Sequence, residues 1–268
     1  MSPALYARCM TGIVQREGLR WVHQRGRFVS ALVRPLVWLA IFAAGFRFVL
    51  GVSITPPYDT YVPYEVYIAP GLIAMIQLFN GMQSSLSMVY DREMGSMKTL
   101  MVSPLPRWFL LLSKLLAGVA VSVVQSYLFL AIAWFWEIEP PMLGYVTVLP
   151  ALVLSGLMLG TLGLVLSSVI RQLENFAGVM NFVIFPMFFA SSALYPLWRV
   201  KESSLTLYWV CELNPFTSAT ELIRFALYGK LDPIAMAVVA GCTLVFMAAA
   251  VVGYDPGRGL IARRVVAE

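Results

Sequence analysis

The feature that most constrains this chain is a series of long apolar runs. Five of them reach the 18 residues that mark a membrane-spanning helix, because about 20 residues at a rise of about 1.5 Å cross a hydrocarbon core of about 30 Å. A sixth run contains Arg34 and Arg47, which lie near its two ends and can extend to the interfaces. The predicted spans are Phe28–Leu50, Ile68–Tyr90, Trp108–Trp136, Val146–Ile170, Ala177–Leu194 and Ile234–Tyr254.

The composition agrees with a membrane protein. Hydrophobic residues make up 60% of the chain and charged residues 12%, whereas about a quarter of the residues in soluble domains are charged. We therefore predict an all-α membrane protein with six transmembrane helices, an N-terminal amphipathic interface helix and short re-entrant helices before the last span. The chain is expected to form one domain over residues 1–268, with the six-span bundle at 28–254 and a cytoplasmic tail at 255–268.

Basic residues set the predicted orientation. Fourteen of the 19 Lys and Arg residues lie in the N-terminal segment, in the loops that follow the second and fourth spans and at their flanks, and in the tail. The positive-inside rule places these segments, and hence both termini, in the cytoplasm. The net charge of +5 thus reflects topology and anionic lipids, and nucleic acid is not an expected partner.

Residues 1–27 lack the apolar core of a cleavable signal peptide. Their apolar residues alternate with Arg8, Arg16 and Arg20, a pattern typical of an amphipathic helix on the cytoplasmic membrane surface. The alternative is an unstructured basic tail.

The segment from Tyr195 to Asp232 is long for a loop and only partly polar. It contains two stretches that are too short to cross the membrane and too apolar for water, separated at Asn214–Pro215. We predict two short helices that dip into the outer leaflet and close the pathway there. The alternative is a surface loop with interfacial aromatics. The residues assigned to this outer gate are Tyr208, Trp209, Asn214, Pro215 and Phe216.

Polar residues form one stripe on the second span. Gln77, Asn80, Ser84 and Ser87 are spaced by three and four residues and share a helix face. Amides inside a bilayer face a bundle interior or a cavity. The stripe therefore either lines a substrate pathway or provides hydrogen bonds between helices.

Small residues recur on the fourth span at helical spacing. Gly156 and Gly160 form GxxxG, and Gly163 with Ser167 repeats the pattern. Such faces allow close approach of helix backbones, so packing is the expected role.

The sequence shows no catalytic or metal-binding pattern. Its single histidine, His23, lies in the basic N-terminal segment, and neither HExxH nor a His/Cys cluster is present. Glu221 and Arg224 are three residues apart and are expected to pair on one helix. No phosphate-binding GxxxxGK[ST] loop occurs, so energy for transport against a gradient must come from a partner or an ion.

A polar segment of 17 residues, Asp91 to Arg107, separates the second and third spans. Its Asp91-Arg92-Glu93, Gly95-Ser96-Met97-Lys98, Leu100, Ser103-Pro104, Arg107 and Lys114 resemble the cytoplasmic loop of ABC-2 type permeases, which are membrane subunits of type V ABC exporters. Similar pieces follow in the order typical of the family. They are RPLVWLAIF (34–42), IAPGL (68–72), SSALYPL (191–197), NPFTSATELIRFALYG (214–229) and GRGL (257–260).

The resemblance implies a half-channel in the bacterial plasma (inner) membrane. Two copies of the chain, expected to be a homodimer, form the pathway, and two copies of a separate ABC ATPase bind ATP and Mg²⁺ and dock from the cytoplasm. The chain itself is then not an enzyme, and it binds no cofactor or metal. The substrate class is an amphiphile such as a lipid, a glycolipid or oligosaccharide, or a drug-like molecule. The resemblance assigns ATPase coupling to Arg92, Glu93, Gly95, Ser96, Met97, Arg16, Arg20 and Arg25.

Two rivals from other classes remain at this stage. One is a polytopic membrane enzyme that modifies lipids, which needs paired acids or a histidine near the headgroups. The other is a passive channel or scramblase.

Overall fold

The computed structural model describes residues 3–23, 25–46, 56–94, 106–170 and 172–254. Every regular element within these ranges is helical. In chain order they are α1 (Pro3–His23), α2 (Arg25–Phe46), α3 (Tyr64–Glu93), α5 (Arg107–Ala133), the 3₁₀ turn η1 (Trp134–Trp136), α6 (Gly144–Val169), α7 (Leu173–Phe189), α8 (Leu197–Ser203), α9 (Leu205–Glu212), α10 (Pro215–Leu227) and α11 (Pro233–Gly253). The all-helical class predicted from the sequence is confirmed for this part of the chain.

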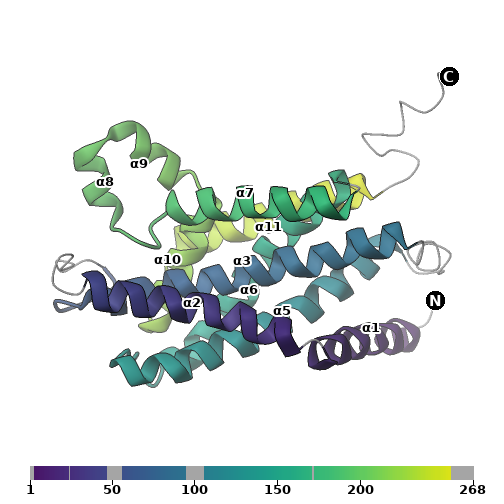
Figure 1. Cartoon of the computed structure of the whole chain (residues 1–268), viewed down its shortest axis with the longest axis horizontal. Helices are drawn as coiled ribbons and strands as arrows, with labels where there is room; N and C mark the ends of the chain where they lie inside the picture. Colours follow the sequence, from purple (N-terminus) through teal and green to yellow (C-terminus); the bar gives the residue numbers. More distant parts are fainter. Residues whose placement is uncertain (1–2, 24, 47–55, 95–105, 171, 255–268) are drawn as a thin grey trace.

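The long helices run side by side along the longest axis of the molecule (Figure 1). At one end, here called the junction end, α3, α6 and α11 finish, α5 and α7 begin, and α1 lies alongside. At the opposite end, the cap end, α8 and α9 form an arch that projects beyond α7, with α10 beneath it (Figure 1). This alternation of helix directions agrees with the order of the predicted spans.

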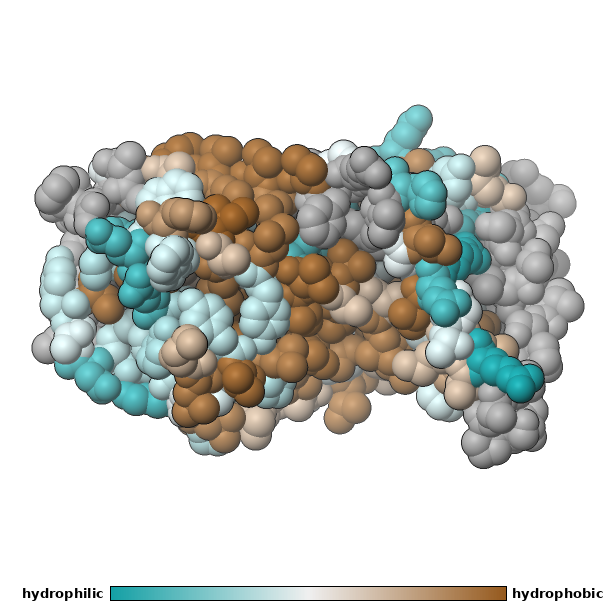
Figure 2. All heavy atoms as spheres, turned by 90° about the horizontal axis from the view of Figure 1, so that it is seen from below, coloured by the Kyte–Doolittle hydropathy of each residue, from teal (hydrophilic) through white to brown (hydrophobic). Residues whose placement is uncertain are grey.

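Among the residues that the structure describes, four helices are long and apolar enough to cross a membrane: Tyr64–Glu93, Trp108–Trp136, Gly144–Val169 and Pro233–Gly253. Two further apolar helices, Leu32–Phe42 and Leu173–Phe189, are shorter. The first and fifth predicted spans fall on these shorter segments, so a count of six remains a prediction. Figure 2 shows a hydrophobic band across the middle of one face, with hydrophilic residues toward both ends.

Two predicted boundaries were wrong. The polar loop was expected to begin at Asp91, but α3 continues through Glu93. The charged side chains of this last turn, Asp91, Arg92 and Glu93, contact α5, α6 and α7 respectively. These contacts support the additional helical turn. The fifth predicted span was expected to reach Leu194, whereas α7 ends at Phe189, shortly after Pro186.

Helix α3 occupies the centre of the bundle, and most of its residues are buried. It packs very closely on α6 through glycines. A Cβ atom built on Gly81 would lie 2.9 Å from the Cα of Gly160, and one built on Gly163 would lie 2.5 Å from the Oγ of Ser85. The packing role predicted for the small residues of α6 is confirmed.

By contrast, α11 is largely exposed along its apolar length, as are parts of α2 and α7. Leu244, Val245 and Phe182 are examples of large apolar side chains that contact little of the chain. An apolar helix can keep such a surface in lipid or against another protein, but not in water.

Candidate coupling junction at the end of helix α3

The last turn of α3 carries a buried ion pair. The Nζ of Lys114 on α5 donates to Oδ2 of Asp91 at 2.5 Å, and both side chains are buried. The Nη2 of Arg16 on α1 lies 3.7 Å from the same carboxylate oxygen, and the Arg16 side chain is half exposed. Asp91 therefore links three helices, and the charges are close enough to offset part of the cost of their burial.

Helix α1 also contacts α5 through aromatic rings. The rings of Tyr6 and Phe109 meet edge to face with centroids 4.9 Å apart. The N-terminal segment is thus a helix packed at the junction end, and the alternative of an unstructured tail is wrong for residues 3–23. The side chains of Arg20 and Arg25, which were predicted to support coupling, lie outside the described residues.

Arg92 binds the end of α6. Its guanidinium donates to the backbone oxygens of Ser167 at 3.0 Å and Ile170 at 3.4 Å. These carbonyls belong to the last turn and C-cap of α6, where helical partners are missing and a positive charge is favoured. The guanidinium carbon also lies 5.2 Å from the ring centroid of Tyr254, whose hydroxyl is 2.7 Å from the Oγ of Ser167. Arg92 therefore joins α3 to the ends of both α6 and α11.

Glu93 binds the start of α7. Its Oε1 accepts a hydrogen bond of 2.8 Å from the backbone N–H of Leu173, the first residue of that helix. A carboxylate at a helix N-terminus is stabilised by the unpaired N–H groups and by the helix dipole. The consecutive residues Arg92 and Glu93 thus bind both sides of the short α6–α7 connection.

The last turn of α3 is thus bonded to both α6 and α7. The polar loop that follows α3 contains Gly95, Ser96 and Met97, which lie outside the described residues.

The polar stripe of α3 divides into two parts. The Nε2 of Gln77 donates to the Oγ of Ser126 at 3.3 Å, and its Oε1 accepts from the Oγ of Ser122 at 2.5 Å. The Nδ2 of Asn80 donates to Oε1 of Gln125 at 2.5 Å. Both amides are buried against α5, which favours the role in hydrogen bonding between helices. Ser84 and Ser87 are only partly buried.

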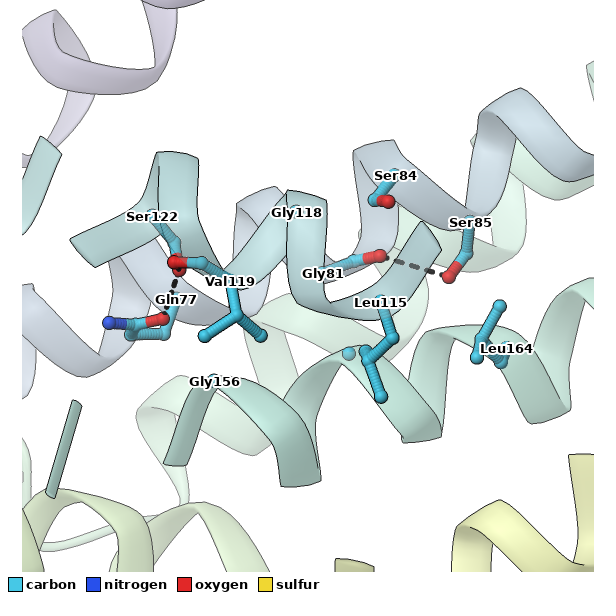
Figure 3. Close-up of a pocket in the computed structure, with 11 residues that line it drawn as sticks. Gln77, Gly81, Ser84, Ser85, Leu115, Gly118, Val119, Ser122, Gly156 and Leu164 are labelled. Carbon is cyan, nitrogen blue, oxygen red and sulfur yellow. Dashed lines mark hydrogen bonds between the residues drawn. The ribbon is translucent and has the colours of Figure 1, made fainter. Parts of the chain in front are cut away.

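A cavity lies where α3, α5 and α6 meet, between Gln77, Ser84, Ser122 and the glycines of α6 (Figure 3). Its volume is about 10 Å³. This is roughly the space that one water molecule requires, so the cavity does not accommodate an amphiphilic substrate within one copy of the chain.

The residues assigned to the outer gate do not form one group. Asn214 caps α10, accepting from the N–H of Phe216 at 3.0 Å, and it donates to the oxygens of Met187 and Ala190 at the end of α7. Phe216 is fully buried and packs on Phe188, and Pro215 is the first residue of α10. Tyr208 and Trp209 lie on α9 in the projecting arch. The predicted break at Asn214–Pro215 is confirmed, and the helix α8 was missed.

The long apolar helices of the described residues and the bonds between the last turn of α3 and helices α6 and α7 describe a helical membrane protein. A sequence profile of the ABC-2 type transporter matches residues 10–228. The chain belongs to the ABC-2 type transporter family.

Three similar proteins are described as permeases. The chain is 31% identical over 169 residues to YbhR of Escherichia coli K12, a probable multidrug ABC transporter permease, covering 62% of this chain and 45% of that protein. It is 25% identical over 226 residues to the putative transport permease ycf38 of Porphyra purpurea, covering 82% and 74%. The match to ycf38 of Cyanophora paradoxa is 27% over 202 residues, covering 74% and 66%. The chain thus spans less than half the length of the bacterial relative.

Proposed function

We propose that this chain is the transmembrane permease subunit of an ATP-driven ABC exporter. Membership of the ABC-2 type transporter family and the permease descriptions of its relatives support this function. ATP and Mg²⁺ bind to a separate ATPase, of which two copies dock on two copies of the permease. The complex resides in the bacterial plasma membrane with both termini of the permease in the cytoplasm.

The observation that carries this proposal is the pair of contacts made by Arg92 and Glu93. We infer that the ATPase contacts the loop at Gly95, Ser96 and Met97. Arg92 and Glu93 then transmit the motion to α6 and α7, because their charged groups are already bound to those helices. Arg16, together with Arg20 and Arg25, supports the same surface from α1 and the start of α2.

The substrate is an amphiphile, and its path lies between two copies of the chain. The cavity between α3, α5 and α6 is too small for such a molecule. Ser84 lines this cavity, whereas Ser87 is partly exposed and does not line it, so Ser87 is the proposed contact with the substrate. Gln77 and Asn80 position this helix face through α5. The arch that contains Tyr208 and Trp209 closes the path on the outer side.

The coupling role is tested with Glu93→Ala in the purified complex of permease and ATPase. The variant loses the charge-assisted bond to α7, so we expect the ATPase to remain bound while transport falls at least about tenfold for each ATP hydrolysed, the factor that about 1.4 kcal/mol produces. Glu174→Ala is the matched control, because Glu174 is an exposed acidic residue in the first turn of α7, the helix to which Glu93 is bonded. Equal transport by both variants would remove Glu93 from coupling, and failure of the parent chain to bind any ATPase would refute the function.

A further inference from the structure

A buried cation lies at the cap end, far from the coupling junction. Arg224 on α10 is only 2% exposed. Its Nη2 donates to the backbone oxygen of Ser192 at 2.8 Å and lies 3.5 Å from that of Tyr67, and its Nη1 pairs with Glu221 one turn earlier. Burial opposes the charge, yet the neighbouring Glu221 carboxylate holds the pKa of Arg224 above its ordinary value. The guanidinium also lies over the ring of Tyr67, with 4.1 Å between its carbon and the centroid.

The carbonyl of Ser192 belongs to the turn that joins α7 to α8. The hydroxyl of Tyr67 donates to the same oxygen at 3.0 Å, and the hydroxyl of Tyr64 donates to the oxygen of Leu194 at 2.7 Å. Ala193 lies directly on α3, since a Cβ atom built on Gly71 would be 2.6 Å from the Cβ of Ala193. The α7–α8 turn is therefore bound both by Arg224 of α10 and by Tyr64 and Tyr67 of α3.

The two sides of the Arg224 contact differ in how firmly they are attached. On one side, α10 is fixed to the bundle: the Oγ1 of Thr147 on α6 donates to the oxygen of Ala226 at 2.6 Å, and Gly144 packs against Leu227. On the other side, the turn leads into the projecting arch of α8 and α9 (Figure 1). Most residues of this arch are exposed. Arg224 therefore bridges a fixed element and the base of an exposed one.

Two buried polar atoms at this contact have no hydrogen-bond partner among the described residues: Nε of Arg224 and Oγ of Ser192. Burial of such atoms without a partner carries a free-energy cost that is relieved when they reach water. The free-energy cost of these two atoms therefore favours opening of the contact, while the hydrogen bonds of Arg224 favour its closure. Such opposing contributions are expected for a contact that opens and closes reversibly.

We propose that Arg224 is a positioning residue that holds the α7–α8 turn against α3 and α10, and that its release lets the arch of α8 and α9 move away from the bundle. The proposal deepens the proposed function, since it identifies the contact that keeps the outer closure shut. It also stands by itself, because the contact exists within a single copy of the chain.

The experiment measures how fast a cysteine at position 192 reacts with a water-soluble maleimide. Ser192→Cys is introduced into the purified full chain after Cys9, Cys211 and Cys242 have been replaced by alanine. Ser192 is 1% exposed, so the parent should label slowly. Arg224→Leu should label at least about tenfold faster, which corresponds to about 1.4 kcal/mol. Lys201→Leu, which removes an exposed cation from α8, should label like the parent.

Conservative variants separate a positioning role from general loss of packing. Arg224→Lys keeps the charge near Glu221 but loses the planar fork that reaches Ser192. Its labelling rate should therefore lie between the rates of the parent and of Arg224→Leu. Tyr67→Phe removes the second donor to the Ser192 oxygen and should accelerate labelling as well. The last two variants keep the proposal testable even if Arg224→Leu does not fold. Parental labelling rates in folded Arg224→Lys and Tyr67→Phe would overturn the proposal.

The assay requires no ATPase and no transport substrate. A fast-labelling Arg224 variant in a chain that binds no ATPase would therefore support the closure while refuting the proposed function. If the Arg224 variants label at the parental rate in a chain that does couple to an ATPase, the closure is refuted while the proposed function is supported.

Discussion

The buried pair of Asp91 and Lys114 leads to the most quantitative prediction. Replacing one member leaves the other charge buried without this partner, a change that costs about 3–5 kcal/mol in stability. The two single variants Lys114→Met and Asp91→Leu should therefore both lose stability in this range, because each breaks the contact of 2.5 Å between the two side chains.

The double variant Asp91→Leu, Lys114→Met completes a thermodynamic cycle. Because no buried charge of this pair then remains, its stability should return to within about 1–2 kcal/mol of the parent. The assay is equilibrium unfolding of the purified chain in mixed detergent micelles, with Lys201→Met as an exposed control that changes stability by less than about 0.5 kcal/mol. Losses well below this range in both single variants, or additive losses in the double variant, would refute the reasoning.

Two further predictions concern packing and topology. Gly81→Ala should destabilise the chain by about 2 kcal/mol or more in the same unfolding assay, because the added methyl group would meet the α6 backbone at 2.9 Å, whereas Gly178→Ala has open space and should be neutral or slightly stabilising. Reporter fusions after Glu137 should read external and those after Lys98 cytoplasmic; an inverted result at either site would break the proposed orientation.

Hydrophobic run length was sufficient to predict the core of the fold. The spans assigned to α3, α5, α6 and α11 match helices of the structure, although Pro70 and Pro150 lie inside two of them, because a long apolar run in lipid must satisfy its backbone hydrogen bonds internally. The GxxxG spacing also identified the close approach between α6 and α3. These are local signals, and each can be read without knowledge of the partner helix.

The junction was predicted only in part, because its geometry depends on distant segments. The resemblance drew attention to Arg92 and Glu93 but assigned them to contacts with another protein. No sequence pattern shows that their partners are Ser167 and Leu173, about 75 to 80 residues away. The partners of the polar stripe left a readable signal: Ser122, Gln125 and Ser126 share one face of α5, and their spacing could have suggested a complementary stripe.

Arg224 shows a different kind of limit. Its pairing with Glu221 was predicted from the spacing on one helix and is confirmed. Its bond to Ser192 depends on how the turn after α7 folds back onto α3, and that fold was not foreseen because α7 was expected to continue to Leu194. A boundary error of five residues therefore hid the contact.

The pairing of polar side chains between α3 and α5 has a consequence for how the chain enters the membrane. Helix α3 is the least apolar of the four long helices, and its amides at Gln77 and Asn80 have their hydrogen-bond partners on α5, which is synthesised later. An isolated α3 would carry these amides into lipid without these partners, whereas a hairpin of α3 and α5 provides each of them with hydrogen bonds. Biogenesis should thus proceed by paired insertion, with the first of the two helices retained at the translocon until the second arrives.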